Sequence, residues 1–119
     1  MKKVIILEDT DSVSKYLALV AKKCGWDSVI FPSVEDLIAN PEVFNDAAFM
    51  ISDFDLADQT AIGAYKFMKA NNINIPVVLH SGNLVAPDII DDNGCSYLID
   101  DVLPKPADLS QLRNLFNKY

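Results

Sequence analysis

Acidic, hydroxyl and amino side chains stand at the ends of four short runs of strand-forming residues. The runs are Val4–Leu7, Ala48–Ser52, Val77–His80 and Asp101–Pro104. The polar residues that follow them are Glu8, Asp9, Asp53, Ser81 and Lys105. Carboxylates that converge in one place repel each other, so a bound cation or a neighbouring ammonium group must offset the repulsion. The pattern therefore predicts one site in which acids, a hydroxyl group and a lysine act together.

Oxygen ligands in a partly open arrangement suit Mg²⁺. Up to four carboxylates are available to it, those of Glu8, Asp9, Asp53 and Asp55. A metal held by carboxylates beside a lysine and a hydroxyl group is typical of phosphoryl transfer, because the positive charges neutralise the phosphoryl oxygens. The nucleophile can be a carboxylate, which then carries an acyl phosphate. Asp53 is the best candidate because it is the central strand-end acid.

The elements that must position these residues alternate between strand and helix. A fifth strand is predicted at Ser28–Phe31. The predicted helices cover about 12–24, a segment starting at Ser33, residues 61–70, a weakly helical 86–93, and a last helix opening at Asp108 with Leu109, Leu112, Leu115 and Phe116 on one face. Apolar strands joined by helices indicate a doubly wound (βα)5, flavodoxin-like fold with a five-stranded parallel sheet covered on both faces. In such sheets the site lies at the carboxyl ends of the strands.

Length and composition restrict the remaining choices. The 119 residues suit a single domain over 1–119, and a net charge of −7 argues against nucleic acid or an anionic membrane as a partner. Cys24 and Cys95 belong to no metal-binding motif and are expected to be reduced thiols. No signal peptide or membrane-spanning stretch is apparent, so a cytoplasmic protein is expected. His80 is interpreted as a strand-end side chain rather than a proton carrier.

The combination resembles the receiver domain of two-component response regulators, the CheY-like family, over nearly the whole chain. In that family an acidic pair follows the first strand, as in Leu7-Glu8-Asp9, and a phosphoacceptor Asp ends the third, as in Ile51-Ser52-Asp53. A Ser or Thr and a small residue end the fourth strand, as in Ser81-Gly82, and a Lys-Pro pair follows the fifth, as in Lys105-Pro106. Each piece is weak by itself, whereas the combination is specific.

The resemblance implies that Asp53 accepts a phosphoryl group from a phosphohistidine on a sensor histidine kinase or a histidine phosphotransfer protein. It implies that Asp9, Asp53 and the backbone carbonyl of Asp55 hold Mg²⁺, with Glu8 acting through water. Lys105 would pair with Asp53 and then with the phosphate. Such a chain is a phosphoacceptor with its own phosphorylation and dephosphorylation chemistry rather than a conventional enzyme, and it acts on an output domain or effector that the sequence does not identify.

Three further roles are implied by the resemblance. Ser81 would bond a phosphoryl oxygen once the phosphate arrives. Asp55 and Asn83 occupy the variable positions that set how fast phosphate is gained and lost, with Asp55 either orienting water or repelling the incoming group. The peptide bond before Pro106 is a candidate for the cis form.

The sequence departs from the family pattern in two places. Leu56-Ala57 replaces the usual Met-Pro pair, and Gly63 comes ten residues after Asp53 rather than eight, so this loop is predicted to be two residues longer. Val102 stands where the family has its switch aromatic, and Tyr97 is the nearest aromatic. The catalytic end therefore fits the family better than the output face does.

Two other readings compete with an active receiver. A degenerate receiver would be an interaction module that is never phosphorylated. A phosphohydrolase of the haloacid dehalogenase type would use Asp53-Phe54-Asp55 as its DxD signature, but that signature belongs after the first strand rather than the third. Nucleotide-binding glycine motifs are absent.

Overall fold

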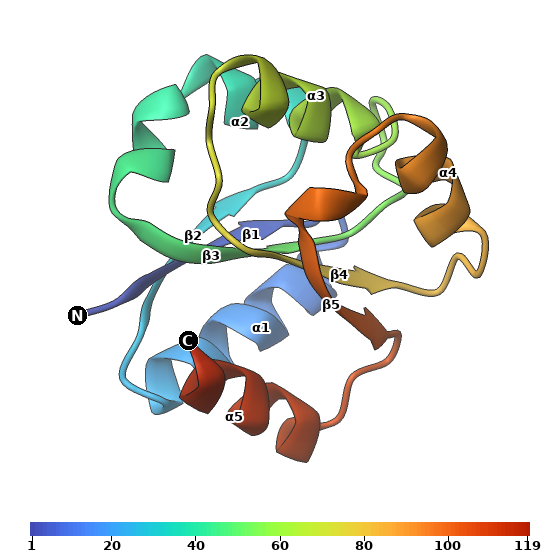
Figure 1. The fold of residues 1–119 in the computed structure, drawn as a ribbon. Helices are drawn as coiled ribbons and strands as arrows, with labels where there is room; N and C mark the ends of the chain where they lie inside the picture. Colours follow the sequence, from blue (N-terminus) through green and yellow to red (C-terminus); the bar gives the residue numbers. More distant parts are fainter.

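The computed structural model describes residues 1–119 and contains one five-stranded parallel sheet with the strand order β2-β1-β3-β4-β5. The strands are β1 (Lys3–Leu7), β2 (Asp27–Phe31), β3 (Ala47–Ser52), β4 (Val77–Ser81) and β5 (Ile99–Pro104). The sheet is the predicted doubly wound arrangement, and its strands run together so that their carboxyl ends share one edge (Figure 1).

Five α-helices cover the two faces of the sheet (Figure 1). They are α1 (Asp11–Lys23), α2 (Val34–Ala39), α3 (Ile62–Ala70), α4 (Ala86–Asp92) and α5 (Leu109–Lys118). Helices α1 and α5 pack on one face, while α2, α3 and α4 pack on the other. None of these helices is both long and apolar enough to cross a lipid bilayer.

Side chains of β1 alternate between two apolar cores. Val4 and Ile6 join the core under α1 and α5, whereas Ile5 and Leu7 join the core under α2, α3 and α4. Successive side chains of a strand point to opposite faces, so a strand that is apolar at every position must be covered on both sides. The apolar run at the start of the chain therefore forms a central strand, and the acids that follow it lie at the middle of the sheet edge.

Local signals set where the helices begin and end. Gly25 follows α1 with a φ of 83°, a left-handed conformation that glycine adopts without strain. At the start of α2, the Ser33 hydroxyl accepts a hydrogen bond from the Asp36 backbone N–H at 3.0 Å. Asp108 and Gln111 form a reciprocal capping box at the start of α5. These caps agree with the helix starts predicted at Ser33 and Asp108.

The structure corrects several details of the predicted elements. Leu109 is exposed and lies outside the apolar face of α5, which is formed by Leu112, Leu115 and Phe116. The fifth strand begins at Ile99 rather than Asp101, because Val77 of β4 pairs with Ile99 before a register shift. Two short 3₁₀ helices, Pro41–Asn45 and Ser96–Leu98, had no signal in the hydrophobic periodicity.

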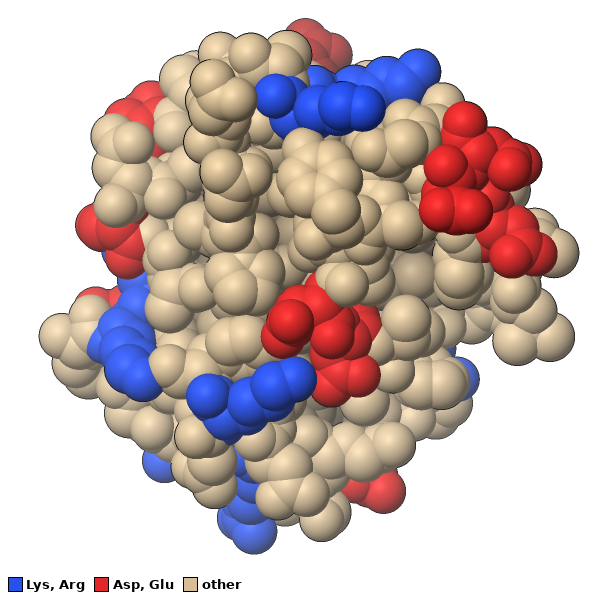
Figure 2. Space-filling model, viewed as in Figure 1, with Lys and Arg blue, Asp and Glu red and all other residues tan.

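The sheet is also less completely covered than predicted. Most residues of the edge strand β5 are exposed, Asp100, Asp101 and Val102 among them. Figure 2 shows acidic side chains gathered over α4 and over this edge, where Lys118 pairs with Asp100 at 3.3 Å. Most of the buried strand residues thus belong to the three central strands, β1, β3 and β4, and Phe31 is the one buried residue of β2.

The loop between β3 and α3 forms a small turn of its own. Asp55 and Thr60 make an isolated antiparallel bridge, which brings the two ends of the turn together. Asp58 at its tip accepts hydrogen bonds from the backbone N–H groups of Val34 and Glu35 at 3.4 and 3.2 Å, and so caps the start of α2. The segment that departs from the family spacing is therefore attached to a neighbouring helix.

The aromatic cluster under α1 and α5 should carry a large part of the folding energy. Phe49 lies within 4.3–5.8 Å, between ring centroids, of Trp26, Phe116 and Tyr119. We expect Phe49→Ala to lower the free energy of unfolding by about 3–5 kcal/mol, because the buried ring leaves a cavity. Urea denaturation would measure this, with the exposed Leu84→Ala as a control that stays within about 0.5 kcal/mol. Equal losses in the two variants would contradict the packing described.

Candidate functional site

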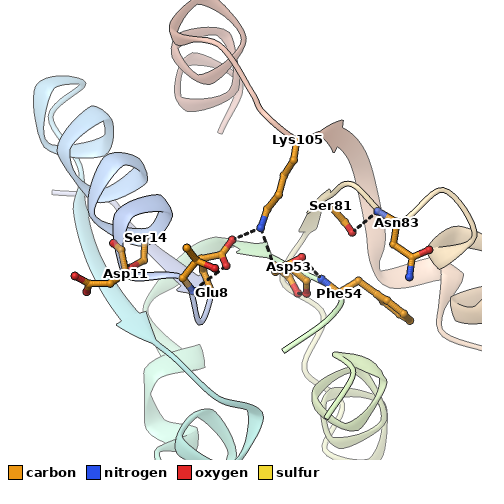
Figure 3. Close-up of polar contacts among 10 residues, drawn as sticks. Glu8, Asp11, Ser14, Asp53, Phe54, Ser81, Asn83 and Lys105 are labelled. Atoms are coloured by element: carbon orange, nitrogen blue, oxygen red, sulfur yellow. Dashed lines mark hydrogen bonds and ion pairs between the residues drawn. The ribbon is translucent and has the colours of Figure 1, made fainter. Parts of the chain in front are cut away.

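The carboxyl ends of four strands bring the predicted polar residues to one edge of the sheet (Figure 3). Glu8 and Asp9 follow β1, Asp53 follows β3, Ser81 ends β4 and Lys105 follows β5. These strands are neighbours in the sheet, so residues nearly one hundred positions apart in sequence come into contact. The peptide bond that joins Lys105 to Pro106 is cis.

Lys105 pairs with two acids at once. Its ammonium nitrogen lies 2.7 Å from Glu8 Oε1 and donates a hydrogen bond of 3.0 Å to Asp53 Oδ2 (Figure 3). The Glu8 and Asp53 side chains are only 1% and 10% exposed, whereas the Lys105 side chain is 25% exposed. One cation thus neutralises part of the charge of two carboxylates that are almost out of contact with solvent.

The surroundings shift the pKa values of Glu8 and Lys105 for different reasons. Burial raises the pKa of Glu8, and the hydrogen bond from Lys105 offsets only part of this effect. Burial opposes the charge of Lys105, but Glu8 and Asp53 outweigh it and raise the pKa of the ammonium group. Lys105 is therefore charged throughout the physiological range, and burial makes the ionised form of Glu8 costly.

The backbone fixes the direction of the Asp53 side chain. Its own N–H donates to the Leu7 carbonyl of β1 at 2.8 Å, and its Oδ1 accepts the Phe54 N–H at 2.7 Å. The buried Ser52 hydroxyl donates to the Asp53 carbonyl at 2.8 Å and lies 2.7 Å from the Tyr65 hydroxyl of α3. Two buried hydroxyl groups therefore connect the backbone of the central acid to α3.

Tyr65 is a site-supporting residue that the sequence analysis did not identify. Its side chain is fully buried, and burial raises the pKa of its hydroxyl above the usual range, with the hydrogen bond to Ser52 opposing the shift. The only signal in the sequence is a tyrosine at a core position of a predicted helix. A polar atom at such a position needs a partner, but the sequence does not say which one.

Glu8 is held by its neighbours on the same edge. Its N–H donates to the Phe31 carbonyl at 3.1 Å, and its Oε2 accepts the Thr10 N–H at 3.2 Å. The other oxygen, Oε1, is buried and has no hydrogen-bond partner in the protein beyond its ion pair with Lys105. This oxygen retains the capacity to bind a cation or its water.

The acids fit a divalent cation of the magnesium type. Carboxylate oxygens of Glu8, Asp9 and Asp53 lie within 4.8 Å of one another, and all the donors are oxygens. Asp55 is not in this group, because its side chain accepts a hydrogen bond from the Asn83 amide at 3.0 Å. Its backbone carbonyl accepts no backbone hydrogen bond, so that oxygen remains available as a ligand.

Ser81 and Asn83 form a second group beside the acids (Figure 3). The Ser81 hydroxyl is nearly buried and accepts the Asn83 N–H at 3.0 Å, while Asn83 Oδ1 accepts the Val85 N–H at 3.1 Å. Because the Ser81 oxygen acts as the acceptor in this bond, its own proton can be donated elsewhere. The Asn83 amide reaches Asp55, so the β3–α3 and β4–α4 loops are joined across the mouth of the site.

His80 precedes this group on β4 and is buried. Burial, together with the charge of Lys105, lowers the pKa of the imidazole to about 4. The ring is therefore neutral at physiological pH. Its position at the end of β4 agrees with its interpretation as a strand-end side chain.

The comparisons with known proteins give structural matches but no sequence match. No family model and no curated protein matches the chain. A response regulator receiver protein from Pseudomonas putida is similar over 99% of this chain and 97% of its own, with 22% identity and a TM-score of 0.84. The receiver domain of the Francisella response regulator 1452 is similar over 99% and 95%, with 20% identity and a TM-score of 0.81.

A third solved structure gives a similar match. The CheY-like receiver domain protein from Methanospirillum hungatei is 16% identical and has a TM-score of 0.80, over 99% of this chain and 92% of its own. At these identities the similarity concerns the fold. The chain has the fold of response regulator receiver domains along nearly its whole length, as the sequence motifs indicated.

The burial of Glu8 leads to a prediction about stability and pH. Its raised pKa means that the folded chain binds this proton at a higher pH than the unfolded chain does, so the contribution of Glu8 to stability falls as the pH rises above the ordinary glutamate range. We expect Glu8→Gln, with metal chelated, to be more stable than the parent at pH 7, and the difference to shrink as the pH is lowered through that window. Lys105 keeps Asp53 as a partner in this variant.

Urea denaturation midpoints at several pH values would measure this difference. The exposed Glu42→Gln serves as the matched control, because it removes the same charge without relieving any burial. A Glu8→Gln variant that is less stable than the parent at pH 7 would mean that the ion pair with Lys105 outweighs the cost of burial.

Proposed function

We propose that this chain is a phosphoacceptor of two-component signalling, in which Asp53 receives a phosphoryl group from a phosphohistidine of a sensor histidine kinase or a histidine phosphotransfer protein. The observation that supports the proposal best is the placement of Asp53. It is the central acid of the edge, its orientation is set by backbone hydrogen bonds, and a lysine is paired with one of its oxygens. The receiver fold makes such a donor the natural partner.

In the proposed reaction a carboxylate oxygen of Asp53 forms a bond to phosphorus. The phosphorus–nitrogen bond of the donor breaks, its electron pair goes to the donor imidazole, and that ring takes up a proton. The product is an acyl phosphate on Asp53 and a neutral histidine on the donor. Lys105 lies against Asp53 before the reaction and can pair with a phosphoryl oxygen after it, because its ammonium group carries several N–H donors.

Magnesium is proposed as the cofactor on the chemistry of the donor set. Glu8, Asp9 and Asp53 would hold it through side chains and Asp55 through its backbone carbonyl. When bound, the ion supplies positive charge next to the phosphoryl oxygens. The buried Glu8 Oε1, which contacts the Lys105 ammonium, supports this assignment because it has capacity for a further cation or water ligand.

The phosphoryl group would act as a switch through the second group of the site. The Ser81 proton is available for a phosphoryl oxygen, and any movement of Ser81 pulls on Asn83, which is bonded to its hydroxyl and to Asp55. The β4–α4 and β3–α3 loops would therefore respond together. Phosphorylation can bias the conformation only through contacts that differ between the two states, and these bonds are candidates for that difference.

We propose that the output of the switch does not depend on the rotation of an aromatic side chain. Val102 and Tyr97 are both exposed, and Val102 lies on the edge strand β5. We expect the output domain or effector to recognise the loops that Ser81, Asn83 and Asp55 connect. The net charge of −7 and the acidic surface over α4 (Figure 2) disfavour direct binding of nucleic acid or anionic membrane by these residues. We place the reaction in the cytoplasm, where unpaired cysteines such as Cys24 and Cys95 stay reduced.

Intact mass spectrometry after incubation with acetyl phosphate and Mg²⁺ would test the proposal. The parent should gain one phosphoryl group. Asp53→Asn should gain none, because the amide lacks the nucleophilic carboxylate. Asp88→Asn, an exposed acid on α4, is the matched control and should behave as the parent. An adduct on Asp53→Asn would show that the acceptor is another residue.

If no adduct is found, two explanations are possible, and a titration with beryllofluoride separates them. Beryllofluoride with Mg²⁺ mimics the acyl phosphate and cannot be lost by hydrolysis. Saturable chemical-shift changes around Asp53 and Ser81 would then indicate fast dephosphorylation. No response to beryllofluoride would favour a degenerate receiver that works as an interaction module.

The acids should control metal affinity directly. We expect Asp9→Asn to weaken Mg²⁺ binding by about tenfold or more, because it removes one of three clustered carboxylates. A titration of backbone amide shifts with Mg²⁺ would measure the change. Asp11→Asn is the control, since Asp11 lies outside the cluster and pairs with Lys15. Equal Mg²⁺ affinity in the parent and Asp9→Asn would contradict the assignment.

A further inference from the structure

A pocket of about 240 Å³ opens between the first turns of α1 and the loop from β5 to α5. Val13 and Tyr16 of α1 form one wall, and Pro106 and Ala107 form the other. The volume is about eight times the ~30 Å³ that one water molecule occupies in the liquid. The pocket therefore has room for a small organic group, somewhat below the size of a typical drug-sized ligand.

His80 contributes the most unusual side chain of the pocket. The residue is 4% exposed, and neither ring nitrogen has a hydrogen-bond partner in the protein. Side chains of β4 alternate, and Val78 belongs to the core under α1 and α5, so His80 faces the same side as the pocket. Buried polar atoms are nearly always paired in proteins, because an unmade hydrogen bond costs about 1–3 kcal/mol. The His80 imidazole is an exception, and a ligand in the pocket would give it a hydrogen-bond partner.

The charge of the surroundings defines the chemistry of that ligand. A neutral imidazole offers one N–H donor and one acceptor nitrogen on different edges of the ring, so an amide-like group, which can accept or donate, can pair with whichever nitrogen it reaches. Lys105 also lines the pocket, and its positive charge repels a cationic ligand. An anionic ligand is disfavoured as well, because the Lys105 ammonium is already paired with the carboxylates of Glu8 and Asp53. Most of the remaining lining is apolar, so the body of the ligand should be apolar as well.

We propose that the His80 pocket is a binding site for a small uncharged molecule with an apolar ring and one amide-like group that pairs with the imidazole. The site is separate from the acid cluster, and the proposal does not rest on phosphorylation of Asp53. The stem of Lys105 is common to both sites, since its ammonium pairs with Asp53 while the side chain lines the pocket. An occupant would therefore touch the lysine that balances the acids.

A larger depression elsewhere on the molecule can be compared with the His80 pocket. It has a volume of about 590 Å³ and lies beside β2, lined by residues that include Lys3, Asn40 and Glu42. No buried side chain without a partner lines it. If size alone governed binding, a small molecule would choose this depression over the His80 pocket.

The test is a titration of the ¹⁵N-labelled chain with benzamide, followed by backbone amide shifts. Benzamidine and benzoate have nearly the same shape and carry a positive and a negative charge. We expect saturable shifts with benzamide at Ser12, Val13, His80 and Ala107, and at least tenfold weaker binding of the two charged analogues. Shifts that do not saturate, that spread equally to Lys3 and Asn40, or that are equal for all three probes would overturn the proposal, leaving water as the occupant.

Variants of His80 separate hydrogen bonding from shape. His80→Leu removes both the donor and the acceptor, whereas His80→Gln keeps one of each. Benzamide should bind His80→Leu at least tenfold more weakly than the parent, and His80→Gln should recover part of the loss. Ala107→Leu, which narrows the pocket while keeping the imidazole, should also weaken binding, and it serves as the test if His80→Leu does not fold. Unchanged affinity in a folded His80→Leu or in Ala107→Leu would refute the site.

Discussion

One ammonium group shared between two nearly buried carboxylates is the interaction on which the site depends. Glu8 and Asp53 lie on neighbouring strands at the middle of the sheet, where little solvent reaches them, and Lys105 lies against both. Charges in such a place are costly unless they are paired. The pairing is incomplete, because three acids face one lysine. This shortage of positive charge is the physical basis on which we propose a metal ion and a phosphoryl group as ligands of the edge.

The parallel sheet makes this arrangement possible. Strand ends that are separated by whole helices in sequence meet at one edge, and apolar side chains on both faces hold β1, β3 and β4 in register. The core fixes the backbone within which Asp53 is oriented, and the Ser52 and Tyr65 hydroxyl groups extend that control to α3. The loops above the edge are less buried and are joined by few side-chain bonds. The buried core and the less buried loops therefore differ in how firmly the structure holds them, which is the arrangement that the proposed switch requires.

The sequence was sufficient for the order of strands and helices and for the residues at the strand ends, because both follow from local patterns. Periodicity marks a helix or a buried strand, and in a parallel sheet the end of a strand is also the place of the site. The sequence could not show that Tyr65 supports Asp53, that Asp58 caps α2, or that His80 lacks a partner. These contacts join residues far apart in the chain and follow from the final packing. The exposure of Leu109 has the same origin, since helical spacing does not tell how far a neighbouring element extends.

The edge strand β5 also affects how copies of this chain meet. An uncovered edge presents free backbone groups to which another strand can add. Here Asp100 and Asp101 lie on that edge, close to Lys118 of α5. Two such edges placed side by side would bring four carboxylates together, with one lysine from each chain to offset them. The acidic edge therefore opposes growth of the sheet from one molecule into the next, and it favours a chain that stays dispersed at high concentration.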